Sequence, residues 1–306
     1  MPKMRAILVG AVDSTKIALE AFARSSEWTL AALVTLDTRL SGRHSDFFDL
    51  SVAASEMGSP IIHVDNVNRD AALSAIGAVA TDYLFVIGWS QICGPRFLNL
   101  ANDRVIGYHP APLPRMRGRA AIPWTILRNE PITAGTLFWI DQGMDTGDVL
   151  DQQFFHVAPN ETAATLYAKH MEALSTMLDR SLPIIASGAA SRKPQDEVCA
   201  TWTARRRPTD GLINWSAPAE DVLRLIRASG PPYPGASTAD GETPVQIWSA
   251  QADTLGSRYF AMPGQVLDVC DAGFAVMCGK GEAIMITEWG PGTTPPRLHS
   301  VLGSRR

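Results

Sequence analysis

His109 occupies a place in the sequence where an acid–base group could work. It directly follows an apolar stretch at 105–108 and precedes a proline-rich loop, 110–114. Active sites of open α/β sheets lie at the carboxyl ends of strands, and prolines hold a loop in one shape. A lone histidine is more often a packing or surface residue, so His109 needs a partner before it can be assigned chemistry.

An acidic loop supplies the candidate partner. The stretch Gln142-Gly143-Met144-Asp145-Thr146-Gly147 follows a predicted strand, and it places glycine close to Asp145 on both sides. Glycine lets a ligand or another backbone approach closely; the nearby Asp141, Asp148 and Asp151 lack such flanks. A carboxylate orients an imidazole and favours its charged form, and an imidazolium stabilises a developing oxyanion. His109 and Asp145 therefore predict a general acid–base centre.

The elements that must position this pair are those of an α/β domain. Short apolar runs alternate with segments of helical spacing, which is typical of a parallel sheet covered by helices on both faces. The predicted strands are 4–10, 28–35, 60–64, 82–88 and 135–140, and the predicted helices are 14–25, 50–57 and 68–79. We therefore predict a doubly wound, Rossmann-like domain. The turn at Gly10 lacks the G-x-G-x-x-G pattern, so a dinucleotide site is not predicted.

A second, smaller domain is predicted beyond a basic linker at 205–208. An amphipathic helix is expected at 219–228, and short strands are expected at 245–249, 264–269, 273–277 and 283–288. Short strands at about ten-residue spacing are typical of a small barrel. We expect a catalytic domain over residues 1–204 and an OB-like β-barrel domain over residues 205–306.

Composition excludes several classes of protein. The net charge of −4 and the pI of about 5.9 argue against a nucleic-acid partner. No apolar run reaches the roughly 18 residues that span a bilayer, and the first residues lack a signal-peptide pattern. The four cysteines are scattered without a C-x-x-C pair, so neither a metal nor a disulfide is predicted. We expect a cytoplasmic protein without a membrane partner.

The motif around His109 resembles that of the 10-formyltetrahydrofolate-dependent formyltransferase family. His109-Pro110-Ala111-Pro112-Leu113-Pro114 and Arg117-Gly118 match the family pattern, and Asp145 lies 36 positions after the histidine, as in the family. The stretch 86–92 looks like the family's pterin-holding loop, and 206–215 and 226–236 resemble the carboxy-terminal part of longer members. The family includes methionyl-tRNA and amino-sugar formyltransferases and the hydrolase domain of 10-formyltetrahydrofolate dehydrogenase.

The resemblance implies a role for each matched segment. His109 and Asp145 correspond to the catalytic pair, and 10-formyltetrahydrofolate is implied as the formyl donor, without a metal. Two loops are expected to hold the folate by their backbones: Trp89, Ser90, Gln91, Ile92, Gln142, Gly143, Met144 and Asp145. A third loop is expected to border the acceptor: Pro114, Arg115, Arg117 and Gly118. The expected acceptor is a small-molecule amine, and a homodimer is left open.

One departure from the family pattern concerns the position two residues before the histidine. The family's asparagine, whose amide would donate to the formyl oxygen, is Gly107 here. Losing one such donor typically costs about 2.7–4 kcal/mol of transition-state stabilisation. The hydroxyl of Tyr108 is one candidate replacement, and a packing role for Tyr108 is the other. The hydrolase domain of the folate dehydrogenase also lacks the asparagine and shares the Tyr-His pair.

Three functions follow from these observations. The leading one is N-formylation of an amino sugar or an amino-acid derivative, because the segment 44–50 resembles small-molecule members and the acidic pI disfavours tRNA. The alternative is hydrolysis of 10-formyltetrahydrofolate to formate and tetrahydrofolate, which Gly107 and Tyr108 favour. A folate-binding protein without catalytic activity is the third.

Overall fold

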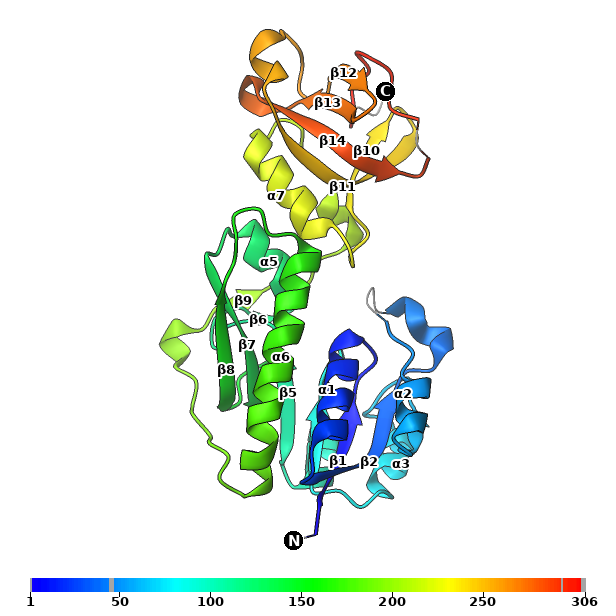
Figure 1. The fold of residues 1–306 in the computed structure, drawn as a ribbon, viewed down its shortest axis with the longest axis vertical. Coiled ribbons are helices and arrows are strands. Elements are labelled where there is room, and N and C mark those ends of the chain that lie inside the picture. Colours follow the sequence, from blue (N-terminus) through cyan, green and yellow to red (C-terminus); the bar gives the residue numbers. More distant parts are fainter. Residues whose placement is uncertain (1, 44–46, 293, 304–306) are drawn as a thin grey trace. The chain divides into compact units, whose positions relative to one another are not determined.

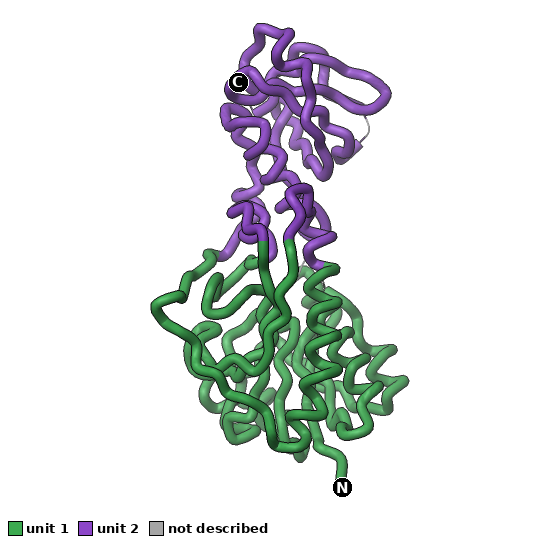
Figure 2. The backbone as a smooth tube through the Cα atoms, turned by 60° about the vertical axis from the view of Figure 1, so that its left-hand side comes forward, with its two compact units in different colours: residues 1–121, 132–156, 168–204 green, residues 122–131, 157–167, 205–306 purple. Residues whose placement is uncertain are grey.

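A computed structural model describes residues 2–43, 47–292 and 294–303 of the protein. The segment that resembles small-molecule members includes His44, Ser45 and Asp46, which lie outside the described residues. Contacts within the chain define two compact units (Figure 2). Unit 1 consists of residues 1–121, 132–156 and 168–204, and unit 2 consists of residues 122–131, 157–167 and 205–306.

Unit 1 contains a seven-stranded sheet of order β3-β2-β1-β4-β5-β7-β8 (Figure 1). Its strands are β1 (Met4–Val9), β2 (Trp28–Thr35), β3 (Ile61–His63), β4 (Tyr83–Val86), β5 (Val105–His109), β7 (Ile132–Trp139) and β8 (Val149–His156). The first five strands in this order run parallel, whereas β7 and β8 are each antiparallel to the preceding neighbour. The predicted Rossmann-like domain is confirmed, with an antiparallel extension at one edge.

Helices cover both faces of this sheet, and alternation along the strands explains why. Neighbouring residues of a strand point to opposite faces, so Leu8 packs with α1 and α6 while Ile7 packs with α3 and α4. Burying such a side chain fully contributes about 1.5–3 kcal/mol. The helices of residues 1–204 are α1 (Asp13–Arg24), α2 (Ser51–Glu56), α3 (Asp70–Gly77), α4 (Pro95–Leu98), α5 (Ala121–Leu127) and α6 (Ala163–Ala186). Residues 122–127 of α5 and 163–167 of α6 belong to unit 2.

The carboxy-terminal segment of unit 2, residues 205–306, is built around the helix α7 and a five-stranded antiparallel sheet of order β10-β11-β14-β13-β12. Val222 and Ile226 of the helix pack against Ile247, Phe274 and Ile284 of the sheet. The elements are α7 (Ala219–Ser229), β10 (Ala236–Asp240), β11 (Thr243–Asp253), β12 (Val266–Cys270), β13 (Gly273–Met277) and β14 (Ala283–Gly290). Isolated bridges join residues 301–302 to the end of β10 and to the residue before β12, which connects the two sheet edges as in a small barrel.

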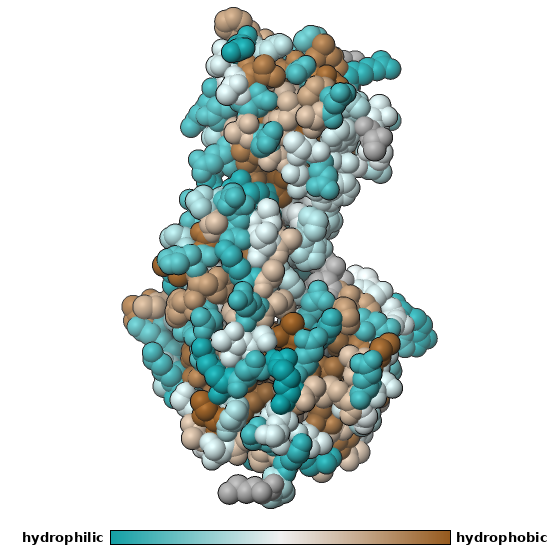
Figure 3. All heavy atoms as spheres, viewed as in Figure 1, coloured by the Kyte–Doolittle hydropathy of each residue, from teal (hydrophilic) through white to brown (hydrophobic). Residues whose placement is uncertain are grey.

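The helices of the described residues differ from a membrane-spanning helix in length or in hydropathy. None of the helices there combines the length and the apolar character needed to cross a membrane. The face drawn in Figure 3 mixes hydrophilic and hydrophobic residues.

Candidate active site

His109 ends β5 with its side chain 8% exposed. Its Nε2 atom lies 2.8 Å from the carbonyl oxygen of Met116. A carbonyl oxygen only accepts, so Nε2 carries a proton and donates it. The Nδ1 atom faces the carboxylate of Asp145, at 3.7 Å from Oδ2. Of the two ring nitrogens, Nδ1 is therefore the one placed to exchange a proton with Asp145 or with a substrate.

The loop that carries Asp145 follows a strand antiparallel to β5. His109 pairs with Thr136 and Ile106 pairs with Trp139, so β7 ends beside the start of β5. The loop must therefore return along β5 to bring Asp145 to the imidazole. It is tightly packed, because a Cβ atom on Gly147 would lie 1.7 Å from the carbonyl oxygen of Trp139. The predicted pair thus forms, although the strand before Asp145 runs antiparallel to β5 and not parallel to it, as the doubly wound pattern predicted.

Hydrogen bonds hold the Asp145 carboxylate and order its loop. The Gly118 amide donates to Oδ2 of Asp145 at 2.8 Å. Asp141 accepts from the Gly143 amide and from the Thr146 hydroxyl within the same loop. Asp141 therefore orders the loop, and Asp145 is the carboxylate placed at His109.

Arg117 is buried and its side chain is bound by Gln195 and Glu197, while the bordering of the acceptor by Pro114, Arg115, Arg117 and Gly118 stays a prediction. Its side chain is 0% exposed and donates to both carboxylate oxygens of Glu197, at 2.9 and 2.6 Å. It also donates twice to Oε1 of Gln195, at 3.0 and 2.8 Å. The Arg117 guanidinium lowers the pKa of Glu197 below its ordinary value. By contrast, Arg115 is exposed and Pro114 is half-buried.

The space beside Gly107 is filled by neighbouring apolar side chains. A Cβ atom on Gly107 would lie 2.9 Å from Cδ1 and Cγ1 of Ile140 and 3.0 Å from Cε1 of Phe138. These side chains therefore stand where the family's asparagine side chain begins. Glycine at this position is matched to its surroundings.

Tyr108 points to the opposite face of β5 from His109, because strand residues alternate. Its hydroxyl lies 3.1 Å from the carbonyl oxygen and 3.2 Å from Nδ1 of His170 in α6. Burial raises the pKa of the Tyr108 hydroxyl above its ordinary value. This geometry leaves Tyr108 the packing role and not that of a substitute oxyanion donor.

His170 makes stability depend on pH. Burial lowers the pKa of this fully buried imidazole to about 3, and its Nε2 has no hydrogen-bond partner among the described residues. Below the ordinary pKa of about 6.5, the unfolded chain binds a proton at this residue that the folded protein refuses. Stability is therefore lost as the pH falls from about 6.5 towards 3, by about 2 kcal/mol at pH 5 from this residue alone.

We expect His170→Gln to lose less stability than the wild type between pH 7 and pH 5. Urea unfolding at both pH values measures the difference, which should be about 2 kcal/mol. His156→Gln is the matched control, because His156 is exposed. An identical pH dependence in His170→Gln and the wild type contradicts the assignment.

The predicted folate loop at 89–92 follows β4 and leaves the same sheet edge as His109, because β4 and β5 are parallel. The Gln91 side chain is engaged locally: Nε2 donates to the carbonyl oxygen of Asp65 and Oε1 accepts from the Val67 amide. Asn68 similarly donates to the carbonyl oxygen of Ile92. The loop is thus braced by the segment after β3.

Exposure differs among the predicted folate residues. Ile92 is 68% exposed and Met144 is 49% exposed, so each of the two predicted loops presents an apolar side chain to solvent. Trp89 is half-buried and Ser90 is exposed, and the other residues of the second loop, Gln142 and Gly143, are exposed as well.

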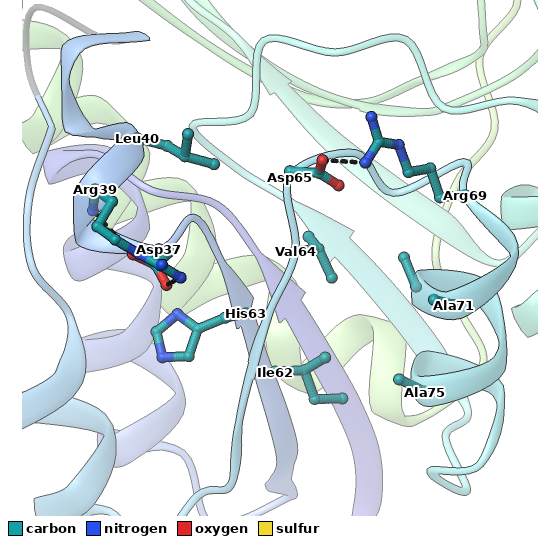
Figure 4. A pocket seen from close by; sticks show the side chains of 11 residues that line it. Asp37, Arg39, Leu40, Ile62, His63, Val64, Asp65, Arg69, Ala71 and Ala75 are labelled. Carbon is teal, nitrogen blue, oxygen red and sulfur yellow. Dashed lines mark hydrogen bonds and ion pairs between the residues drawn. The ribbon is translucent and has the colours of Figure 1, made fainter.

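A separate pocket of about 600 Å³ lies at the carboxyl ends of β2 and β3 (Figure 4). Two ion pairs line it, Arg39 with Asp37 and Arg69 with Asp65. His109 and Asp145 are not among its lining residues.

Two residues of the site are absent from the sequence-based expectation. Met116 binds His109 through its backbone, and Gln195 contacts Arg117 from a segment 78 residues away in the sequence. Neither leaves a signal in the sequence: a backbone carbonyl has no residue type, and Gln195 stands in a polar stretch like many surface glutamines.

Comparisons with known proteins identify the class. Residues 31–182 match the sequence model of the formyl transferase family, and residues 206–296 match the model of its C-terminal domain. The chain belongs to the formyl transferase family.

Solved structures share the fold at low sequence identity. WlaRD, a sugar 3N-formyl transferase solved in the presence of dTDP and 5-N-formyl-THF, is 17% identical with a TM-score of 0.65, over 94% of this chain and 98% of that one. An N-formyltransferase from Helicobacter canadensis, in complex with folinic acid and dTDP-3-aminofucose, is 16% identical with a TM-score of 0.66, over 93% and 99%. HypX from Aquifex aeolicus, in complex with tetrahydrofolic acid, is 18% identical with a TM-score of 0.67, over 95% of this chain and 45% of HypX.

Proposed function

We propose that this protein transfers the formyl group of 10-formyltetrahydrofolate to the amino group of a small metabolite, an amino sugar or an amino-acid derivative. The observation that carries the proposal is the contact between Nδ1 of His109 and the carboxylate of Asp145 at the end of β5. Membership of the formyl transferase family supports formyl chemistry. The two sugar N-formyltransferases align over nearly their whole length, which supports an acceptor of that class.

The proposed reaction needs one positive and one negative group beside the formyl carbon. The acceptor amine attacks this carbon and forms a tetrahedral oxyanion. His109, protonated on Nδ1 while Nε2 stays bound to Met116, donates to the oxyanion. Asp145 accepts the proton that the attacking amine loses, directly or through a water. The oxyanion then collapses, the bond between the formyl carbon and N10 of the folate breaks, and the proton held by Asp145 passes to N10, so that tetrahydrofolate leaves as the secondary amine. The Nδ1–Oδ2 distance of 3.7 Å leaves a gap to be closed when substrate binds.

The proposed folate site combines the two loops that surround this pair. The backbone of 89–92 is proposed to bind the edge of the pteridine, and the Gln91 side chain holds this loop through its bonds to the segment after β3. Ile92 and Met144 are the exposed apolar side chains that can cover the faces of a fused ring.

We further propose a domain boundary between residues 204 and 205, where the contact-defined units also change.

Acceptor dependence tests the proposal. Tetrahydrofolate release is measured with and without a panel of amino sugars, nucleotide-linked amino sugars and amino acids, and formate is quantified alongside. We expect a suitable amine to raise release by at least about tenfold, because acceptor binding assembles the reactive geometry. If formate is released fast without an amine and this release is lost in His109→Ala, the protein hydrolyses 10-formyltetrahydrofolate and the formyl-transfer proposal is wrong.

A further inference from the structure

Asp145 is held at its backbone as well as at its carboxylate. Nε2 of Gln195 donates to the carbonyl oxygen of Asp145 at 2.8 Å and to that of Gly147 at 2.7 Å. Both protons of one amide group are therefore spent on the Asp145 loop. Asp145 has a φ of +56°, a left-handed conformation that is costly for a residue with a side chain. Such a conformation persists only where surrounding contacts enforce it.

Arg117 determines which way the Gln195 amide points. A guanidinium only donates, so the oxygen of Gln195 must face Arg117 and its nitrogen must face the two carbonyl oxygens. Arg117 donates to that oxygen through two nitrogens, and its side chain is completely buried. Glu197 binds the remaining side of the guanidinium in a bidentate pair. The donors and acceptors of the Gln195 amide are thus all used, and its orientation is fixed.

The two contacts to Asp145 start from one short strand. Arg117 and Gly118 form β6 (Arg117–Gly118), which pairs with β9 (Trp202–Thr203). Arg117 holds Gln195, which holds the Asp145 backbone, while the Gly118 amide binds the Asp145 carboxylate. We propose that Gln195, oriented by Arg117, is the positioning residue that holds Asp145 at His109. The assignment rests on the proposed function for its catalytic consequence, and on the hydrogen bonds alone for its structural part.

Gln195→Glu tests the proposal with almost no change in shape. The carboxylate keeps the contact with Arg117 but has no proton for the carbonyl oxygens of Asp145 and Gly147, which it repels. Gln153→Glu is the matched control. Gln153 lies on β8, and its Oε1 also accepts a hydrogen bond from an arginine, from Nη1 of Arg180 at 2.8 Å. If Gln195→Glu does not fold, Gln195→Met removes the amide without adding charge.

Hydrogen exchange tests the structural part of the proposal, that Gln195 holds the Asp145 loop, independently of activity. Peptides covering residues 112–120 and 141–149 are followed by mass spectrometry. We expect faster exchange there in Gln195→Glu and not in Gln153→Glu, because the Gly118 amide is protected by its bond to Asp145. Unchanged exchange in Gln195→Glu overturns the proposal.

Kinetics then separate positioning from a general structural role. In the wild-type background Gln195→Glu should lower kcat about tenfold to a hundredfold. In the Asp145→Asn background the same substitution should change kcat far less, because the group it positions no longer reacts. Equal losses in both backgrounds overturn the proposal. If the wild-type protein formylates no amine, the proposed function is contradicted instead. The hydrogen-exchange experiment then still tests whether Gln195 positions Asp145.

Discussion

Replacing Asp145 with asparagine is expected to lower kcat at least about 10²-fold, and His109→Ala is expected to do the same. Asparagine can still accept from the Gly118 amide through its side-chain oxygen, so the loop keeps its anchor while the charge facing His109 is lost. Folate binding should change much less, because the proposed pteridine contacts come from backbone groups. Single-turnover kinetics and folate titration measure the two quantities separately.

Asp151→Asn is the matched control for this prediction. Asp151 belongs to the same region of the sequence but binds Arg180, with Nε–Oδ2 at 2.6 Å. It should keep wild-type kcat while losing some stability. Near-wild-type kcat in Asp145→Asn or in His109→Ala would show that the acid–base pair has been assigned to the wrong residues.

Restoring the family's asparagine at position 107 is expected to slow the enzyme and not to accelerate it. A Cβ atom at position 107 would lie 2.9 Å from Ile140 and 3.0 Å from Phe138, closer than van der Waals contact, so Gly107→Asn overpacks the wall beside His109. Overpacking of this kind costs about 1–3 kcal/mol of stability, and a displaced His109 can lose about 10²-fold in turnover. Urea unfolding and turnover, with and without an acceptor amine, measure both effects.

A second substitution tests the cause of that loss. Ile140→Ala removes the atoms nearest to the added side chain, so Gly107→Asn with Ile140→Ala should recover part of the activity that Gly107→Asn loses. Ile140→Ala alone is the control for the cavity it creates. A Gly107→Asn protein that is faster than the wild type and equally stable would show that the asparagine fits, and that glycine merely lacks the donor.

Two kinds of contact hold the proposed catalytic pair: one between residues close in the sequence, and others between residues far apart in the sequence. The His109 ring is held by Met116, only seven residues away and just beyond the proline-rich loop that follows it. Asp145 is held by Gly118 and by Gln195, at 27 and 50 residues. The short-range contact keeps Nδ1 free for proton exchange, and the long-range contacts bring the carboxylate to it.

Local patterns were sufficient to predict much of this architecture. The alternation that sends Ile7 and Leu8 to opposite cores is visible in the sequence, because side-chain direction in a strand repeats every two residues. The strands at 28–35 and 273–277 are found at the predicted residues for the same reason. The spacing of His109 and Asp145, read against the family motif, identified the pair that the structure brings together.

Tertiary structure alone decided the direction of β7, the burial of Arg117 and the role of Gln195. An apolar strand such as 132–139 reads the same in either direction, because hydrophobic periodicity carries no sign. Arg117 looks like a surface or ligand-binding arginine until Glu197, 80 residues away, supplies the charge that permits its burial. The role of the Gln195 amide likewise depends on the residues that it contacts in the folded protein. Hydrogen bonds between distant residues are set by the folded backbone, and the residue types along the chain do not encode which of them will meet.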